Sequence, residues 1–283
     1  MIIKKALFLI VLAIIKLFLF SSWLNDNLVA DVFNAPDTVS GWMCLAGVFG
    51  WAWEIYFNFS GYTDMVTGMA LLLGYRLGDN FKHPYAARNL QEFWRCWHIS
   101  LSMFIRDYIY IPLGGNRKGW LRAQVNILVA MVLSGIWHGA GLTFIIWGAL
   151  HGAGMVVNNL WRRYISERVR FIIPGIIARL LTFMFVCLAW IFFRASSVSD
   201  ALLICKKILS AGDSTPEAGT LVALLLFVSL IAIYPALMDI RNKISTIIIE
   251  LPWYLLPLVI VPILAVTFFI SPSGVPGFIY ASF

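Results

Sequence analysis

Strongly apolar runs recur along the chain and alternate with short polar segments. A helix that crosses a membrane needs roughly 17–25 mostly apolar residues, and this character is found in Leu7–Leu24, Trp42–Phe59, Leu142–Leu160, Ile176–Phe193, Thr220–Met238 and Trp253–Ile270. Shorter or more polar helices are predicted over Asp64–Leu77, Leu90–Ile111 and Ala123–Trp137. Asp200–Leu209 predicts an amphipathic helix at the membrane surface, with Lys206 and Lys207 toward water. The pattern predicts an all-α, polytopic membrane protein of about 7–9 spanning or re-entrant helices.

Composition agrees with this interpretation. Of 283 residues, 61% are hydrophobic and 12% charged, whereas soluble proteins have roughly 45–50% apolar and about 25% charged residues. The remaining charges are too few to cover a soluble core of that size, so the lipid bilayer is the expected partner. No internal repeat or low-complexity segment divides the chain, and we expect one domain over residues 1–283.

The net charge of +7 does not indicate a nucleic-acid partner, because the basic residues separate apolar runs and form no continuous stripe. The four cysteines lie far apart with no metal-like spacing, so we expect small buried side chains and neither a disulfide nor a metal site. An apolar run follows Lys4 and Lys5 without a small-residue cleavage site. We expect it to stay on the protein as a membrane helix.

Basic residues cluster in two places that predict the orientation. Eight lie between Gly61 and Arg122, and a second group comprises Arg162, Arg163, Arg168 and Arg170. Lys and Arg accumulate in cytoplasmic loops, so both clusters are expected on that side. The turn at Gly139–Gly141, between the two helices that separate these clusters, then faces away from the cytoplasm. From Ala123 to His138 a helix rises roughly 22 Å, which puts His138 most of the way across the bilayer, with His98 on the cytoplasmic side.

The helix predicted from Leu90 begins with Asn89 as N-cap and Glu92 three residues later, as in a capping box. One face of a continuous helix would carry Trp94, Trp97, His98, Leu101, Ser102 and Ile105. The same segment carries Glu92, Arg95, Arg106 and Asp107. It therefore cannot face lipid on all sides, and we expect it to be re-entrant, interfacial or enclosed by other helices.

Histidines preceded by tryptophan stand at positions 98 and 138. Ionisable residues at membrane depth are functional candidates, and a buried neutral imidazole can accept a proton from a hydroxyl nucleophile. For His138 the alternative is a histidine that only packs helices, and for His98 it is membership of an interfacial aromatic belt.

Two further polar positions have a structural alternative. His151 lies in a small-residue helix where interhelical hydrogen bonding would explain it. Asp64 follows Tyr56–Thr63, where it could cap the next helix or line a buried cavity. His83 is expected in a loop and needs no role.

Several motifs together resemble the membrane-bound O-acyltransferase family, in its bacterial branch of alginate O-acetylation and teichoic-acid D-alanyl transfer proteins. They are Tyr56–Asp64 (YFNFSGYTD), Phe93–Ser100 (FWRCWHIS), Arg106–Tyr110 (RDYIY), Leu113–Arg117 (LGGNR), Trp137–Gly139 (WHG) and Leu188–Arg194 (LAWIFFR). The resemblance covers residues from about Lys16 to Leu209. One departure is Cys96, where the family usually has arginine, and the chain is expected to lack about the first third of the family's fold.

The resemblance implies that His138 is the catalytic histidine and His98 a second active-site histidine, in a fold that encloses a tunnel. Substrate or tunnel candidates are Trp94, Trp97, Ser102, Asp64, Trp137 and His151. It also implies an acyl group, most simply acetyl, passing from a cytoplasmic thioester such as acetyl-CoA or an acyl carrier to an extracytoplasmic polysaccharide or partner acetyltransferase. No permanently bound cofactor is expected, and the location is the inner membrane. D-alanyl transfer and an inactive fragment or assembly component stay open as alternatives.

Overall fold

The computed structural model describes residues 2–166 and 173–271, and the part described is helical without a strand. Arg168 and Arg170 of the second basic cluster lie outside it. Within the described residues, five helical stretches are long and apolar enough to cross a membrane: Ile2–Asn34, Trp120–His138, Gly175–Arg194, Ala218–Glu250 and Trp253–Ile270. The predicted all-α, multi-pass membrane fold is confirmed.

The chain packs into two compact units. The first comprises residues 1–35, 43–79 and 216–283, and the second comprises residues 36–42 and 80–215. The helices of the first unit are α1 (Ile2–Ile14), α2 (Ser22–Leu24), α3 (Ala30–Asn34), α4 (Gly41–Leu72), α12 (Ala218–Glu250) and α13 (Leu256–Ile270). Those of the second are α5 (Leu90–Cys96), α6 (Ile99–Ile105), α7 (Trp120–His138), α8 (Leu142–Trp161), α10 (Gly175–Arg194) and α11 (Val198–Leu209).

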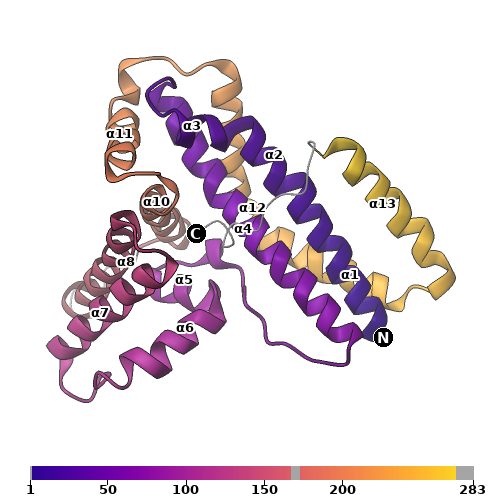
Figure 1. Ribbon diagram of the computed structural model, residues 1–283, viewed down its shortest axis with the longest axis horizontal. Helices are drawn as coiled ribbons and strands as arrows, with labels where there is room; N and C mark the ends of the chain where they lie inside the picture. The colour runs from indigo at the N-terminus through magenta and orange to yellow at the C-terminus, as the bar shows by residue number, and fades with distance from the viewer. Residues whose placement is uncertain (1, 167–172, 272–283) are drawn as a thin grey trace. The chain divides into compact units, whose positions relative to one another are not determined.

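In the first unit, α1 to α3 form one helical run alongside α4 (Figure 1), joined by π-helical turns at Ile15–Ser21 and Asn25–Val29. Glycines on α4 let the two backbones approach closely. A Cβ at Gly61 would lie 3.1 Å from Lys16 and Leu17 side-chain atoms, and one at Gly68 would lie 3.0 Å from the carbonyl oxygen of Ala6. Small residues serve this purpose in membrane helices. The contacts run in opposite sequence directions, so the run and α4 are antiparallel.

The predicted helix break at Gly61–Asp64 is wrong. α4 continues without interruption through these residues, so Asp64 is not an N-cap and Asp64–Leu77 is not a separate helix. The reason lies outside α4: Lys16 Nζ lies 2.6 Å from Asp64 Oδ2 and neutralises the acid inside the helix.

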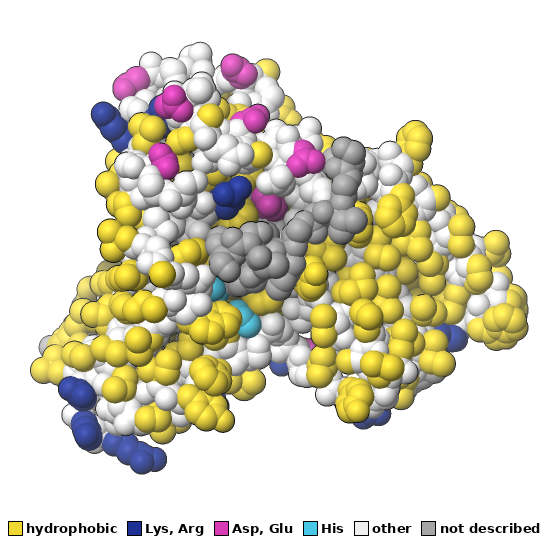
Figure 2. Space-filling view, viewed as in Figure 1, with side chains coloured by type: hydrophobic (Ala, Val, Ile, Leu, Met, Phe, Trp, Pro, Cys, Tyr) yellow, Lys and Arg dark blue, Asp and Glu magenta, His cyan; other side chains and the backbone are white. Residues whose placement is uncertain are grey.

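In the second unit, α7 and α8 form the predicted antiparallel hairpin, with a turn at Gly139–Gly141. A Cβ at Gly148 would collide with the backbone of Met131, and one at Gly152 would lie 2.9 Å from Leu128. Glycine is therefore required for this close pairing. Apolar side chains cover the outer faces of α7 and α8, while Lys and Arg gather at the end of this unit where α6 meets α7 (Figure 2).

The expected helix over Leu90–Ile111 is broken in two. Its start is as predicted, because Asn89 Oδ1 accepts the Glu92 N–H at 2.9 Å, although the Glu92 carboxylate accepts from the N–H of Arg88. The chain then reverses at His98, whose φ of 43° is left-handed, before α6 begins. The common face predicted for residues 94–105 is therefore wrong. α5 and α6 instead form a short helical hairpin with His98 at its tip.

The amphipathic helix predicted from Asp200 is α11, which starts at Val198 with Ser197 as its N-cap. Ser197 Oγ accepts the Asp200 N–H at 3.1 Å. Lys207 Nζ donates to the carbonyl oxygens of Asp37 and Val39, each at 2.7 Å. These bonds fasten the surface helix to the loop before α4.

Candidate active site

His98 is held by a loop residue that sequence reasoning missed, Asn80. The Asn80 side-chain oxygen lies 3.3 Å from His98 Nδ1 and accepts the backbone N–H of Ser100 at 3.1 Å. Its own backbone oxygen accepts the Ile99 N–H at 3.0 Å. The loop thus fixes the left-handed turn that holds the imidazole at the hairpin tip. The one sequence signal for this residue was its place in a polar Asp-Asn turn.

These bonds define the tautomer of His98. A backbone N–H can only donate, so the Asn80 atom that faces Ser100 is the carbonyl oxygen. The same oxygen faces His98 Nδ1, which must therefore carry the proton, and Nε2 keeps its lone pair. Burial lowers the pKa of His98 from 6.5 to about 4. The imidazole is neutral at physiological pH and has one basic nitrogen.

His138 ends α7 inside an aromatic cage. Its ring centroid lies 4.9 Å from that of Trp137, 5.1 Å from that of Trp147 and 5.1 Å from that of Phe193. Only 7% of the residue is exposed. Phe193 comes from α10, in the Leu188–Arg194 motif, so the motif contributes the wall of this cage.

The two histidines lie close to one another. The Trp137 ring contacts both, with its centroid 6.5 Å from that of His98. The expectation that His98 lies apart, near the basic end of α7, is wrong. The break after α5 lets the α5–α6 hairpin reach the far end of α7, where His138 sits.

His151 extends the cluster on the other side of Trp147. Its ring lies 5.1 Å from the rings of both Trp94 and Trp147. The residue is fully buried, and neither ring nitrogen has a hydrogen-bond partner among the described residues. The interhelical hydrogen bond that would have explained His151 is therefore not made in the part described.

Of the remaining predicted site residues, Trp97 and Ser102 belong to the α5–α6 hairpin, and Asp64 lies in the other unit. Trp97 is 1% exposed and packs against Phe93 and Trp190, so it belongs to the aromatic core beneath the hairpin. Ser102 donates to the carbonyl oxygen of Trp97 at 3.2 Å. Asp64 belongs to the first unit, where its partners are Lys16 and Arg241.

A cavity of about 1070 Å³ lies between α5, α6, α7 and the end of α8. Its lining combines arginines with amides and aromatic rings: Arg95, Arg106, Arg162, Arg163, Gln91, Gln124, Asn116, Asn159, Tyr110 and Trp120. The Arg163 guanidinium lies 4.9 Å from the centre of the Trp120 ring. Trp94 and Ser102 also line it, so the cavity runs from the basic end of α7 toward the α5–α6 hairpin. Four guanidinium groups make it suited to a phosphorylated ligand.

Amides on three helices brace this cavity. Gln91 Nε2 donates to Asn159 Oδ1 at 2.8 Å, and Asn159 Nδ2 donates to Gln124 Oε1 at 2.8 Å. Asn158 also donates to Gln91. Because the network links α5, α7 and α8, it holds α5, which carries Arg95, next to the end of α8, after which Arg162 and Arg163 follow.

Comparison with known proteins gives a consistent result. The model of the MBOAT (membrane-bound O-acyltransferase) family matches residues 3–198. The chain is 44% identical over 176 residues to a protein of Helicobacter pylori named peptidoglycan O-acetyltransferase, covering 62% of this chain and 33% of that protein. It is 40% identical over 182 residues to a Pseudomonas fluorescens protein named "Probable alginate O-acetylase AlgI", covering 63% and 34%.

A teichoic acid D-alanyltransferase of Bacillus subtilis is more distant. It is 27% identical over 157 residues, covering 52% of this chain and 40% of that protein. The chain thus spans about a third of the length of the curated relatives it matches.

Proposed function

The chain belongs to the membrane-bound O-acyltransferase family, and we propose that it transfers an acyl group, most simply acetyl, across the membrane to a hydroxyl acceptor. The donor is a cytoplasmic thioester, and the acceptor is an extracytoplasmic polysaccharide or a partner acetyltransferase that hands the group on. The observation that carries the proposal is the pair His98 and His138 around Trp137, with a basic cavity leading toward it.

In the proposed reaction, His138 is the general base. Its imidazole takes the proton of the acceptor hydroxyl as that oxygen attacks the thioester carbonyl carbon. The tetrahedral intermediate collapses, the carbon–sulfur bond breaks, and the thiolate leaves with the proton that the imidazole carried. Acyl ester and free thiol are the products, and the histidine returns to its neutral form.

His98 acts on the thioester side. A neutral imidazole with Nδ1–H held by Asn80 presents Nε2 in one fixed direction. This arrangement suits a residue that positions the thioester or the thiol leaving group next to His138. A preorganised neighbour of this kind lowers the barrier because no reorganisation is needed during the reaction.

The cavity supports a phosphate-bearing donor. Acetyl-CoA and carrier-bound phosphopantetheine thioesters both have phosphate groups that arginine binds well. Arg162 and Arg163 lie at the end of α8 that the positive-inside tendency assigns to the cytoplasm. Trp94 and Ser102 line the route from this cavity toward the histidines, and Trp137 and His151 flank the reacting groups.

Two observations support the proposed acceptor: the names of the relatives and the orientation of α7. The most similar relatives reported above are named as O-acetyl-transfer proteins of peptidoglycan and alginate, which favours acetyl over D-alanyl transfer. The C-terminal end of α7, with His138, lies away from the basic end of that helix. We assign the chain to the inner membrane, where a cytoplasmic donor and an envelope acceptor can meet.

Substitution of His138 tests the assignment. In membranes that contain the full chain, His138→Ala should abolish acylation of the envelope polymer while the amount of inserted protein is unchanged. His83→Asn is the control, because His83 lies outside the cluster and asparagine tolerates its left-handed backbone. Unchanged acetylation in His138→Ala would disprove the role of His138.

Donor choice separates the alternatives. Purified chain that transfers acetyl from acetyl-CoA excludes an inactive assembly component. Transfer only from a D-alanyl carrier protein would replace the acetyl assignment by D-alanylation.

A further inference from the structure

The arginine-lined cavity of the second unit stops short of His138. The last residue of α7 that lines it is Met131, and α8 contributes Met155. Among the described residues, neither His138 nor His98 nor His151 belongs to the lining. His138 comes seven residues after Met131 on α7, a rise of roughly 10 Å. A thioester bound in the cavity therefore cannot reach His138 unless a side chain moves.

The indole of Trp94 lies between the cavity and the side chains next to His138. It lines the cavity, and the residue is only 7% exposed. Its ring centroid lies 5.1 Å from that of His151 and 5.8 Å from that of Trp147. These two rings and Trp190 contact one another and form what we call the inner layer. Because the Trp147 ring lies 5.1 Å from His138, the way from the cavity to His138 passes the Trp94 indole.

Packing holds the Trp94 indole in place. Its Nε1 is buried and has no hydrogen-bond partner among the described residues, so a change of rotamer would break no hydrogen bond within that part of the chain. The helix that carries it is anchored, because Asn89 caps α5 and Gln91 donates to Asn159 on α8. The side chain can therefore turn while α5 stays in position.

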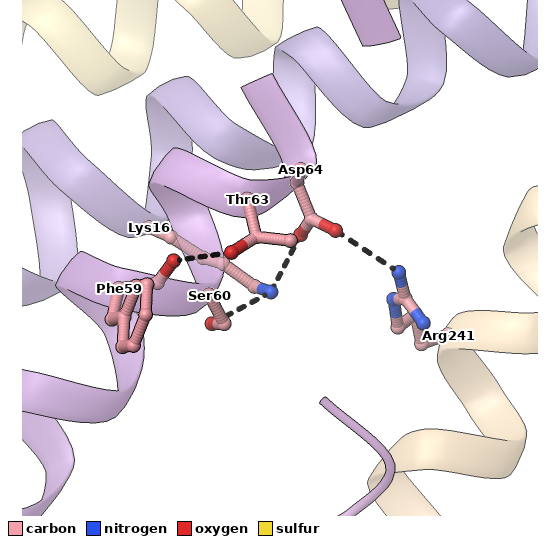
Figure 3. Close-up of polar contacts among 6 residues, drawn as sticks. All are labelled: Lys16, Phe59, Ser60, Thr63, Asp64 and Arg241. Carbon is pink, nitrogen blue, oxygen red and sulfur yellow. Dashed lines mark hydrogen bonds and ion pairs between the residues drawn. The ribbon is translucent and has the colours of Figure 1, made fainter. Parts of the chain in front are cut away.

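The inner layer contains buried polar atoms that lack partners in the part of the chain described. They are both ring nitrogens of His151 and the indole nitrogens of Trp147 and Trp190. By contrast, the buried Lys16 Nζ of the first unit donates to Ser60 Oγ at 3.0 Å and to Asp64 Oδ2 at 2.6 Å (Figure 3). Since buried polar groups are normally hydrogen-bonded, the unmet groups of the inner layer favour a polar ligand that enters when Trp94 turns aside.

The unmet groups indicate the chemical class of that ligand. An indole N–H can only donate, and a neutral imidazole has one N–H and one lone pair. Together with Trp94, the inner layer thus offers three indole donors and one imidazole donor but a single acceptor. A carbonyl oxygen accepts and brings no donor of its own. The carbonyl of an acyl thioester therefore fits this layer better than a sugar hydroxyl or an ammonium group.

Close packing of the inner layer limits the size of the ligand. His151 and Trp190 are 0% exposed and Trp147 is 1% exposed. Room for the acyl end must therefore come from the volume that the Trp94 side chain leaves when it turns. An acetyl group is smaller than an indole, whereas a long acyl chain is not.

We propose that Trp94 is the gate between the donor cavity and His138, and that it limits the size of the acyl group that passes. The inference rests on the proposed acyl transfer, in which the thioester carbonyl carbon must come to His138. With the indole turned aside, the thioester carbonyl accepts hydrogen bonds from the inner layer and the acyl end reaches His138. The structure shows the gate closed.

Cysteine accessibility tests the gate without any acyl transfer. Ser134 lies on α7 beyond the cavity lining and is 1% exposed, so Ser134→Cys reports on the space behind the gate. In the solubilised full chain, a charged methanethiosulfonate should label this position at least about ten-fold faster when Trp94→Ala is added, because a closed gate limits access to the molecules in which it is open. Phe185→Ala is the matched control. Its ring also contacts His151, at 6.0 Å, but is absent from the cavity lining, so the labelling rate should not change.

Donor size tests the second part of the proposal. Trp94→Ala should raise the transfer of hexanoyl relative to acetyl, each supplied as its CoA thioester, about ten-fold or more. Phe185→Ala should keep the ratio of the unsubstituted chain. If Trp94→Ala does not fold, Trp94→Phe opens a narrower passage, and both readouts should change in the same direction by a smaller factor.

Other results overturn the proposal. Equal labelling of Ser134→Cys with and without Trp94→Ala, or an equal acceleration by Phe185→Ala, would rule out a gate at Trp94. An unchanged ratio of hexanoyl to acetyl transfer would reject its role in acyl size. Labelling that changes as expected in a chain that transfers no acyl group would support the passage and contradict the proposed function, so the two failures are distinguished.

Discussion

At the residue scale, the basicity of His98 depends on Asn80. Because the Asn80 oxygen accepts the proton of Nδ1, the lone pair of Nε2 has a fixed direction. Asn80→Ala removes this acceptor and one bond to Ser100, so we expect acyl transfer to fall about ten-fold or more. Asn80→Asp keeps an oxygen acceptor and should retain more activity than Asn80→Ala. Transfer rates and helix content of the two purified variants check this, and equal rates in both would show that the tautomer is not set by Asn80.

The buried state of His98 also predicts a pH dependence of stability. Its folded pKa is about 4 and its ordinary value is 6.5, so below pH 6.5 the unfolded chain binds a proton that the folded chain does not. The contribution of neutral His98 to the free energy of unfolding is therefore fully present above pH 6.5 and is lost as the pH falls toward 4. The unfolding temperature of the native chain should fall across this window more steeply than that of His98→Gln. Parallel curves for the two proteins would contradict the assignment.

At the element scale, the hairpin of α7 and α8 depends on glycine. A side chain at Gly148 would meet the backbone of Met131, which cannot move without separating the helices. Gly148→Ala should therefore destabilise the chain by about 1–3 kcal/mol, the usual cost of overpacking. Gly219→Ala is the matched control, since its Cβ would meet no described atom within 4 Å. Unfolding of both variants in detergent gives the comparison, and similar stabilities would show that the helices can separate freely.

Helices could be predicted where a local sequence feature was enough to determine where they begin and end. A long apolar run without breaks predicted α10, because a helix is the arrangement that satisfies the backbone of such a segment in a bilayer. The hairpin of α7 and α8 was predicted from the two basic clusters on either side of it and from the turn at Gly139–Gly141. The cap at Asn89 was equally local and was found. By contrast, the uninterrupted α4 and the broken α5–α6 hairpin depend on partners far along the chain. Lys16 neutralises Asp64 from 48 residues away, and Asn80 holds the reversal at His98 from 18 residues away.

The candidate site was predictable in its members more than in its geometry. His98, His138 and Trp137 were identified from their types and motif, and they do lie together. Their proximity was missed because a continuous helix from Leu90 was assumed, which keeps His98 near the basic residues. Asn80 carried no signal except a polar turn, since only the folded chain shows that its side chain meets an imidazole.

At the scale of the whole molecule, the charge distribution predicts which ends of the helices face the cytoplasm. The loop between α6 and α7 carries Arg117 and Lys118, whereas the segment between α11 and α12 carries Asp213 and Glu217. Lys and Arg stay on the cytoplasmic side during insertion. The helices α7 and α10 are long and apolar enough to cross, and α8 returns antiparallel to α7, so we expect three crossings between these two segments. An odd number of crossings puts the segments on opposite sides, in agreement with their charges.

Cysteine labelling in whole cells measures this orientation. Gly212→Cys lies in the acidic segment, where a new Cβ would meet no described atom within 4 Å, and Lys118→Cys lies in the basic loop. A membrane-impermeant maleimide should label Gly212→Cys in intact cells and Lys118→Cys only after permeabilisation. The unsubstituted chain is the control, because its four cysteines are buried or partly buried. The reverse pattern would move the arginine-lined cavity to the outer face, where a cytoplasmic thioester could not reach it.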